Sequence, residues 1–404
     1  MCIRDSTEIA ANVDEDIIDS LTGGRLVGSV TSFENFAECP LRYYLRYGVD
    51  LKEREEFTFS PVNFGVVLHA VIREVCDEIK KNGESYYLIS EEKRREMVKR
   101  SVAAITDIYQ NSILKDSSRN SFMIKRMEDL ADRTVWAMGE QLKCGDFVPF
   151  VFEHKFNMEV GDGDRKQLMS GTIDRVDICE NGTDVYVRII DYKTGKKDFN
   201  IVKTYYGIDI QLMVYMEAAM KLVAKMRPGK NVIPAGVFYY NISDPIVSAT
   251  TESAEEIEDK IKGELRLKGM VNSDKDIAEK MDNTEGTSLN IPVSRKADGG
   301  FDSRRSKVMN TEQFNILGRF VDVRAIDTAD RIAGGDIRRS PYKDGQFSSC
   351  DRCPYGAVCG FSVDLPGCNY RKLKKFDDEV LWNNIKEGVD ENGKKMDTGA
   401  EERD

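Results

Sequence analysis

Apolar and polar side chains alternate in short runs across the middle of the chain, from residue 146 to residue 242, a pattern typical of half-buried strands. The runs predict strands at 146–160, 168–178, 185–193 and 231–242. A helical spacing over roughly 205–226 precedes the last strand, and helical patterns fill the chain before residue 145. The resulting order, α-β-β-β-α-β, predicts an α/β fold with a mixed central sheet and helical additions.

The second and third predicted strands are joined by a short turn that contains Asn-Gly at 181–182, a strong hairpin signal. Pairing about that dipeptide makes partner numbers sum to 363. Asp174 is then expected opposite Ile189, one diagonal step from Asp191. Lys193 shares the same face, because side chains alternate along a strand.

Two carboxylates beside a lysine suggest a site for a hard divalent cation. Asp174 and Asp191 offer oxygen ligands that suit Mg²⁺ or Mn²⁺. Lys193 is placed to orient or help deprotonate an attacking water and to balance negative charge. The competing interpretation is a surface hairpin with alternating charges.

Two helical patterns add polar side chains to this candidate site. Gln211 and Tyr215 are four residues apart, so they share one helix face and can point together toward the carboxylates. In FGVVLHAVIREV, His69 follows Gly65 by one turn. A lone histidine is more often structural than a ligand, so the residues alone leave His69 open.

The chain has nine cysteines and no secretory signal, which favours metal binding over a disulfide framework. The stretch CDRCPYGAVC supplies Cys350, Cys353 and Cys359. For the fourth ligand we expect Cys39, which lies just before Pro40 where the backbone breaks. The other cysteines that could take this place are Cys76, Cys144, Cys179 and Cys368. Four thiolates suit either zinc or a [4Fe-4S] cluster, and spacing does not separate the two.

The net charge of −11 argues at first against a nucleic-acid partner. Segments 1–20, 251–265 and 376–404 together carry about −15, however, so the rest of the chain is near +4. Basic positions that could follow a phosphate backbone are Lys196, Lys197, Arg304 and Arg305. Solvated loop charge is the alternative interpretation. No apolar run approaches the ~20 residues of a membrane helix, and we expect a cytoplasmic protein.

Several separated motifs resemble those of one known family. They are SFENFAECPLRYYLRYG, GVVLHAVI, GTIDRVD, IIDYKTG, QLMVY, CDRCPYGAVC and PGCNYRKL, which together span residues 30 to 373. The chain resembles the RecB-like branch of the PD-(D/E)XK nuclease superfamily, and most closely the C-terminal nuclease domain of AddB-type subunits.

The resemblance implies a Mg²⁺- or Mn²⁺-dependent deoxyribonuclease, acting as an exonuclease in repair of double-strand breaks. His69, Asp174 and Asp191 look like the metal ligands, Lys193 like the catalytic lysine, and Gln211 with Tyr215 like the supporting QxxxY motif. The family's [4Fe-4S] ligands match Cys39, Cys350, Cys353 and Cys359, which favours iron and sulfur over zinc. DNA and an AddA-type helicase-nuclease are the implied partners.

Domain organisation follows from the same resemblance. We expect a poorly ordered extension (1–28), a helical part with the first cluster cysteine (29–145), a nuclease core (146–245), a helical or loop insertion (246–330), an iron-sulfur segment (331–375) and an acidic tail (376–404). The chain has no G-x-x-x-x-G-K-[ST] loop, and its abrupt start, MCIRDS, favours a fragment of a longer protein. Alternatives are a stand-alone nuclease of the CRISPR-associated type and a non-catalytic DNA-binding module.

Overall fold

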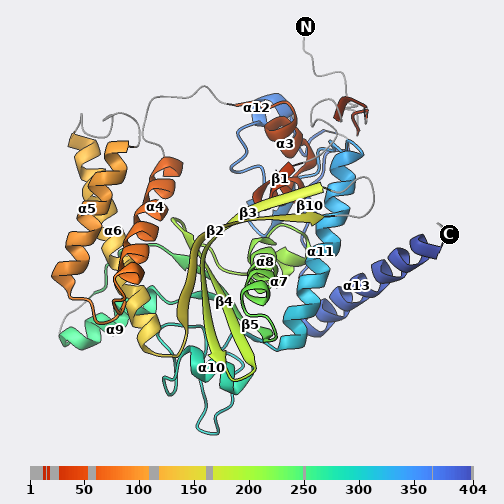
Figure 1. Ribbon diagram of the computed structural model, residues 1–404. Coiled ribbons are helices and arrows are strands. Elements are labelled where there is room, and N and C mark those ends of the chain that lie inside the picture. The colour runs from red at the N-terminus through yellow and green to blue at the C-terminus, as the bar shows by residue number, and fades with distance from the viewer. Residues whose placement is uncertain are drawn as a thin grey trace.

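A mixed, seven-stranded sheet lies between two sets of helices (Figure 1). The computed structural model describes residues 12–14, 16–18, 27–52, 61–108, 118–160, 167–248, 252–365 and 367–401. Most of the expected extension 1–28 therefore lies outside the described residues. No helix in the described part is long and apolar enough to cross a membrane.

The sheet is built around the central strands predicted from the alternation. Its order is β1-β3-β4-β5-β6-β7, with β2 paired to the other side of β3. The strands are β1 (Val27–Ser29), β2 (Val148–Val160), β3 (Gln167–Asn181), β4 (Asp184–Lys193), β5 (Asn231–Asn241), β6 (Lys268–Asn272) and β7 (Val308–Met309). β2, β3 and β4 form an antiparallel set, whereas β4 and β5 are parallel and joined through helices.

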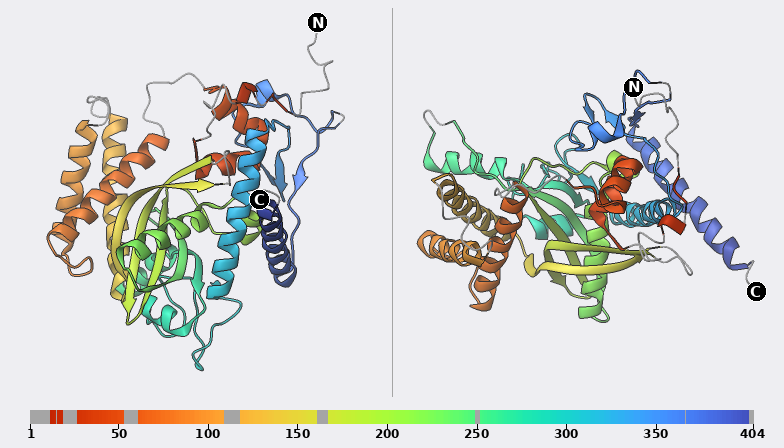
Figure 2. Two further views of the ribbon diagram at one scale, coloured as in Figure 1. Left: turned by 45° about the vertical axis from the view of Figure 1, so that its right-hand side comes forward. Right: turned by 90° about the horizontal axis from the view of Figure 1, so that it is seen from above.

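Each face of the sheet has its own apolar core. One core packs beneath α4 (Pro61–Lys81), α5 (Glu91–Ile108) and α6 (Ser118–Lys143). The other packs against α2 (Val30–Glu38), α8 (Gln211–Met226), α11 (Thr311–Ala333) and the start of α13 (Asp378–Glu401). Seen from above, α4–α6 stand to one side of the sheet, with α11 and α13 on the other (Figure 2).

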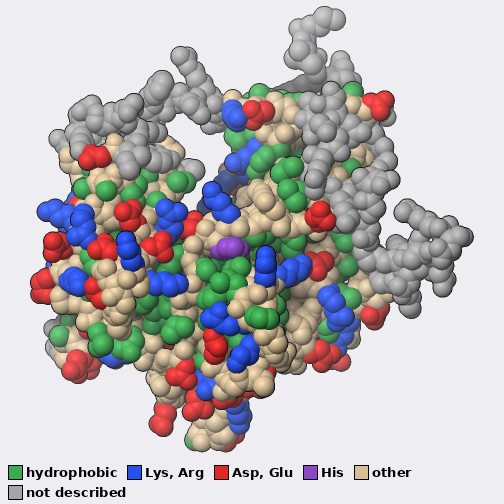
Figure 3. Space-filling view, viewed as in Figure 1, with side chains coloured by type: hydrophobic (Ala, Val, Ile, Leu, Met, Phe, Trp, Pro, Cys, Tyr) green, Lys and Arg blue, Asp and Glu red, His purple; other side chains and the backbone are tan. Residues whose placement is uncertain are grey.

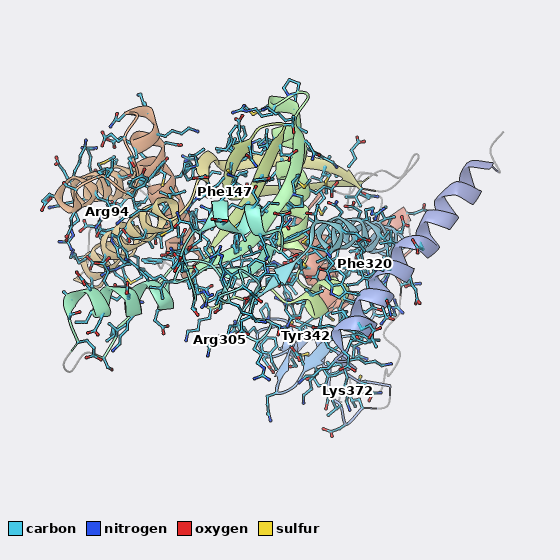
Figure 4. The ribbon with its side chains drawn as sticks, turned by 90° about the horizontal axis from the view of Figure 1, so that it is seen from below. Arg94, Phe147, Arg305, Phe320, Tyr342 and Lys372 are labelled. Atoms are coloured by element: carbon cyan, nitrogen blue, oxygen red, sulfur yellow. The ribbon has the colours of Figure 1, made fainter. Side chains whose placement is uncertain are left out.

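The remaining elements decorate these layers. They are α3 (Pro40–Tyr43), the π-helical η1 (Tyr44–Gly48), α7 (Ile201–Tyr205), α9 (Ala254–Glu264), α10 (Lys275–Met281), β8 (Tyr342–Asp344), β9 (Phe347–Ser348), α12 (Gly356–Cys359) and β10 (Arg371–Lys372). β10, β8 and β9 form a second, small sheet. In the view from below, the labels Tyr342 and Lys372 mark this small sheet, and Arg94 of α5 lies on the other side of the molecule (Figure 4).

The helix break before Cys39 follows local rules. The Ser29 hydroxyl caps α2 by accepting a hydrogen bond from Ser32 N at 3.1 Å. Cys39 is extended (φ −167°), and Pro40 then starts α3, since a proline without an N–H is tolerated at the first helical position. The break leaves Cys39 at the junction of two short helices.

Three sequence expectations were wrong in detail. The helix expected over 205–226 is two helices, α7 and α8, separated by a turn in which Gly207 has a positive φ of 76°. The segment 246–330, expected as helices and loops, also contributes β6 and β7 to the central sheet. β1 was not expected, and it is a three-residue strand beside β3.

The hairpin register also differs from the expected one. Asn181 pairs with Asp184, so the two-residue turn is Gly182-Thr183 and partner numbers sum to 365, not 363. Gly182 has a φ of 60°, a value that glycine adopts without steric cost. Because the shift in the sum is two, every side chain keeps its expected face.

A fully buried ion triad lies on the α4–α6 side of β3 and β4. Arg175 donates two hydrogen bonds to Asp177, from Nε to Oδ1 and from Nη2 to Oδ2, both at 2.7 Å. Arg188 Nε donates to Asp177 Oδ2 at 2.9 Å, and its guanidinium lies over the Phe147 ring. The three side chains are at most 1% exposed. One carboxylate therefore neutralises two buried guanidiniums only in part.

A half-buried carboxyl, Asp322, lies where α8 packs on α11, and it makes stability depend on pH. Burial and a hydrogen bond with Glu217 raise the pKa of Asp322 to about 8. The unfolded pKa is near ~3.9, so the folded chain holds a proton that the unfolded chain releases between these values. The free energy of unfolding should therefore fall as pH rises from about 4 to about 8.

Asp322→Asn should remove this dependence, because an amide cannot ionise. We expect the variant to gain on the order of 1 kcal/mol over the wild type at pH 9 and little at pH 5. Urea unfolding at the two pH values measures the difference. Equal effects of the substitution at both pH values would show that Asp322 is ionised throughout.

Candidate active site

Three carboxylates line up across neighbouring strands. Phe152 pairs with Arg175 and His154 pairs with Ile173, so Glu153 of β2 lies opposite Asp174 of β3. On the other side of β3, Arg175 pairs with Ile190, the residue before Asp191, and Asp174 Oδ2 accepts a hydrogen bond from Tyr192 N, the residue after it. Asp174 and Asp191 are therefore neighbours at the end of the β3–β4 pairing.

The site occupies the point where β3 and β4 separate. Main-chain pairing between these strands ends at Arg175 and Ile190. Beyond it, Asp174 Oδ2 accepts a hydrogen bond from Tyr192 N at 2.6 Å. A side-chain carboxylate thereby occupies the place of a main-chain acceptor and is fixed by β4 itself.

His69 reaches this point from α4 on one side of the opening. Its Nδ1 lies 3.4 Å from Asp174 Oδ1 and 3.8 Å from Glu153 Oε1. Burial lowers the pKa of His69, but the neighbouring Asp174 and Glu153 carboxylates outweigh it and raise the pKa to about 10. The site therefore attracts positive charge strongly.

Asp191 places a buried carboxylate beside Lys193. Burial, and then the neighbouring Asp174 charge, raise the pKa of Asp191 to about 7, although Lys193 opposes both. Asp191 Oδ2 is buried and forms an ion pair with Lys193 Nζ at 2.5 Å. Such an oxygen is suited to a cation.

Lys193 begins a chain of hydrogen bonds into α8. Its Nζ donates to Gln211 Oε1 at 2.8 Å, and Gln211 Nε2 donates to Tyr215 OH at 2.9 Å. The two side chains expected to share a helix face are therefore joined to each other and to the lysine. Burial raises the pKa of the Tyr215 phenol, which remains neutral.

A glycine makes room for Tyr215. A Cβ on Gly171 of β3 would lie 2.7 Å from two atoms of the Phe156 ring and 2.9 Å from Tyr215 Cε1. The two rings meet edge to face with centroids 5.6 Å apart. The glycine of GTIDRVD thus lets the Tyr215 ring pack closely on β3.

Glu34 of α2 holds the N-terminus of α8. Its Oε1 accepts hydrogen bonds from Ile210 N at 2.9 Å and Gln211 N at 3.0 Å, where a helix leaves N–H groups without internal partners. Burial raises the pKa of Glu34 to about 7, while Lys197 lowers it. The position of Gln211 therefore depends on a carboxylate from another helix, a residue that sequence reasoning missed.

Removing this carboxylate should weaken both fold and site. Glu34→Ala is expected to cost about 0.5–2 kcal/mol of stability, the range for loss of a helix cap, and to slow any reaction that depends on Gln211. Glu34→Gln keeps an oxygen acceptor and should retain most of both. Urea unfolding and reaction rates measure the two effects, and an alanine variant equal to the glutamine variant would contradict the capping role.

The donor set fits a hard cation. Among described residues, the group whose ligand atoms all lie within 4.8 Å of one another is His69, Glu153 and Asp174. The two carboxylates supply the oxygen ligands that suit Mg²⁺ or Mn²⁺, the imidazole adds a nitrogen, and the Asp191 carboxylate lies beside them. Glu153 was not expected; its φ of 48° lies in a strained region for a residue other than glycine, a common feature of functional sites.

The expected DNA-binding residues lie on two segments that touch. Lys196 is exposed, whereas Lys197 Nζ is 3.0 Å from Asp209 Oδ1 and lies over the Tyr239 ring. Arg304 and Arg305 are exposed on the loop before β7. An ion pair of 2.5 Å between Lys307 and Asp198 ties that loop to the turn of the two lysines.

The four expected cluster cysteines also come together. Burial raises the pKa of Cys350, and Cys39, Cys353 and Cys359 add to the effect. Cys39 and Cys359 share a small apolar cluster with Leu41. The segment that follows Cys39 and the segment that carries Cys353 and Cys359 are also joined by a hydrogen bond. The Tyr355 hydroxyl donates to Leu51 O at 2.9 Å. All four residues are free thiols, and Cys39 is buried.

Comparison with known proteins gives concordant matches. The sequence profile of the PD-(D/E)XK nuclease superfamily matches residues 28–360. The chain is 34% identical over 399 residues to the B-type subunit of the ATP-dependent helicase/deoxyribonuclease of Lachnoclostridium phytofermentans, covering 96% of this chain and 34% of that protein. The protein of the same name from Clostridium acetobutylicum is 34% identical over 391 residues, covering 94% and 34%.

The chain thus spans about a third of the length of the curated relatives it matches. The profile match, in contrast, covers most of the chain, from β1 to the end of the cysteine motif, and includes every residue of the site described above. The chain belongs to the PD-(D/E)XK nuclease superfamily.

Proposed function

We propose that this protein hydrolyses phosphodiester bonds of DNA with the help of a divalent cation, as the nuclease part of a helicase-nuclease. The observation that carries the proposal is that Glu153, Asp174 and Asp191, from three neighbouring strands, gather beside His69. The names of the relatives, which describe a helicase/deoxyribonuclease, agree with it.

The proposed ligands of the cation are His69, Asp174 and Asp191, with Glu153 as an additional donor. A bound Mg²⁺ or Mn²⁺ ion would supply a Lewis acid for the phosphate and an acidified water. Binding the ion requires His69 to lose a proton, since only neutral imidazole offers a lone pair.

Side chains of the protein would then position the phosphate and stabilise the negative charge on it. Lys193 Nζ, held by Gln211 Oε1 at 2.8 Å, would donate to a phosphate oxygen and stabilise the charge that develops on it. Tyr215 holds the Gln211 amide, so Gln211 presents its oxygen to the lysine. Asp191 Oδ2 lies 2.5 Å from Lys193 Nζ and helps to hold the lysine in place.

Charge on the open face supports DNA as the substrate. Lys and Arg side chains lie around a central histidine on the face shown in Figure 3. The exposed Lys196, Arg304 and Arg305 extend the basic surface along the two linked segments. We propose that these three residues and Lys197 contact the DNA backbone. We further propose a cytoplasmic role in repair of double-strand breaks, with an AddA-type helicase-nuclease as partner.

A [4Fe-4S] cluster is proposed for Cys39, Cys350, Cys353 and Cys359. A tetrahedral zinc site brings its sulfurs to about 3.8 Å from one another, given Zn–S bonds of ~2.3 Å. No three cysteine sulfurs lie within 4.8 Å of one another in the described part of the chain. The match of these cysteines to the cluster ligands of the family favours iron and sulfur over zinc. Its role here would be to tie α2 and α3 to the segment after α11.

An assay on end-labelled single- and double-stranded DNA, with and without free ends, tests the function. With Mg²⁺, the wild-type chain should release labelled product, and Asp191→Ala should release none above background. Equal cleavage by both proteins would refute the proposed site, whereas DNA binding without cleavage by the wild type would favour a non-catalytic module. Iron, sulfide and broad visible absorbance after anaerobic purification would support the cluster; stoichiometric zinc would reject it.

A further inference from the structure

A cavity of about 220 Å³ lies between α11, the turn before α8 and the chain on either side of Cys39. Its volume corresponds to roughly seven water molecules. Four arginines line it: Arg324 and Arg331 from α11, Arg338 from the segment that follows, and Arg371 from β10. We call this cavity the arginine pocket. Its other walls include Ala37 and Pro40, on either side of the Glu38-Cys39 step, and Tyr206 with Gly207 before α8.

Positive charge in the arginine pocket exceeds negative charge. Asp327 lines it and lies 3.7 Å from Arg331, and the buried Asp336 binds Arg331 and Arg338 at 2.8 and 2.6 Å. Two carboxylates therefore face four guanidiniums. The pKa of Arg371 is lowered by burial, and Arg331 and Arg338 lower it further. Arg371 is more buried than Arg331 and Arg338, which stay partly exposed, so the excess positive charge is open to an anion from solvent.

Several guanidinium N–H groups remain available toward the arginine pocket. Arg324 uses only Nε, which donates to Tyr205 O at 3.2 Å. Arg338 uses Nε and Nη2, both toward Asp336. Arg371 uses Nε toward Ser340 O and Nη2 toward Ala37 O and Glu38 O. Among the described residues, the other guanidinium nitrogens of Arg324, Arg338 and Arg371 have no protein acceptor.

We propose that the arginine pocket binds a phosphate group, supplied by the DNA strand on which the nuclease acts. Guanidinium groups bind phosphate oxygens through two parallel hydrogen bonds, and phosphate charge would offset the excess described above. The location fits a strand that passes the active site, because Tyr206 and Gly207 belong to the turn leading into Gln211. The DNA source of the phosphate rests on the proposed function.

A competing explanation is that these arginines offset the charge of the cysteine site. Arg371 Nη2 donates to Glu38 O at 3.1 Å, directly before Cys39, so this guanidinium lies next to the cysteine site. Arg324 separates the two ideas: it belongs to α11, its guanidinium stacks on Tyr205 and Phe320, and Cys39 is not among its partners. An effect of Arg324 on phosphate binding would not follow from a role in the cysteine site.

The experiment measures binding to the full 404-residue chain in EDTA, so that no DNA is cut. Fluorescent single-stranded oligonucleotides with and without a 5′ phosphate, and inorganic pyrophosphate as competitor, are the probes. The variants are Arg324→Gln, Arg338→Gln and their combination. Arg319→Gln is the control, since Arg319 is exposed on the same helix but outside the arginine pocket.

The double variant should bind DNA at least about tenfold more weakly than the wild type and Arg319→Gln. The slope of log K against log salt should fall by about 1 for each lost phosphate contact. Pyrophosphate should compete with DNA for the wild type but not for the double variant. A preference for the 5′-phosphorylated strand would identify a terminal phosphate, and equal binding of both strands an internal one.

Other outcomes decide between sources or reject the proposal. Loss of pyrophosphate binding with unchanged DNA binding would keep the phosphate site but assign it to a free phosphate compound. DNA and pyrophosphate binding equal to the wild type would overturn the proposal, and altered iron content or absorbance in those variants would then assign the arginines to the cysteine site. If wild-type DNA binding depends on Arg324 and Arg338 but Mg²⁺ produces no cleavage, the proposed function fails and the arginine pocket stands.

Discussion

Lys193→Ala is expected to lower the rate of DNA cleavage by about 10²–10⁴-fold, the range for loss of a positioned proton donor or charge stabiliser. The lysine is the only described cation within reach of both Asp191 and Gln211, at 2.5 and 2.8 Å. Its removal takes a positive charge from the site without removing a proposed metal ligand. Single-turnover cleavage of end-labelled DNA at saturating Mg²⁺ measures the loss.

Lys225→Ala is the matched control, because Lys225 is exposed on α8, the helix that carries Gln211. It should cleave at the wild-type rate. Isothermal titration with Mn²⁺ gives a readout besides activity: Lys193→Ala should still bind the ion, whereas Asp174→Ala should not. A Lys193→Ala variant that cleaves as fast as the control would remove the lysine from the mechanism.

Asp177→Ala is expected to destabilise the protein by about 3–5 kcal/mol, the cost of leaving buried charge without its partner. Asp177 is the carboxylate shared by Arg175 and Arg188, and all three are at most 1% exposed. Without it, two guanidiniums remain in the core between β3 and the α4–α6 helices. Urea unfolding monitored by tryptophan fluorescence measures the change.

A triple replacement separates charge from packing. Arg175→Met, Asp177→Leu and Arg188→Met together remove all the buried charge and keep similar side-chain volumes, so most of the lost stability should return. A single Asp177→Ala variant within about 0.5 kcal/mol of the wild type would mean that water reaches the triad, since surface substitutions typically have effects of that size.

Alternation along the chain was sufficient to predict the central strands and the faces of their side chains. The four expected strands differ from β2, β3, β4 and β5 by a few residues at their ends. The motif residues also meet as expected: Asp174, Asp191, Lys193, Gln211 and Tyr215 form one connected set. The alternation of side chains between the two faces of a strand depends only on neighbouring positions, so it can be read from the local sequence.

Long-range packing decided what the sequence did not predict. β1 and β7 are two or three residues long, too short to show a period, and form because longer strands offer them an edge. The position of the hairpin turn depends on which residue adopts the positive φ. Gly182 adopts it, so Asn181 remains paired at the end of β3 and lies outside the two-residue turn. Glu153 and Glu34 belong to ordinary-looking segments and acquire their roles only when distant elements meet them.

The hydrogen bond from Tyr192 N to Asp174 Oδ2 makes one amide proton a spectroscopic reporter of the site. Its exchange with deuterated water depends on a carboxylate, not on a neighbouring strand. Asp174→Ala should therefore accelerate exchange at Tyr192 selectively, while amides deeper in β4, such as that of Ile189, stay protected. The state of Asp174 can thus be followed by nuclear magnetic resonance without substrate, metal or turnover.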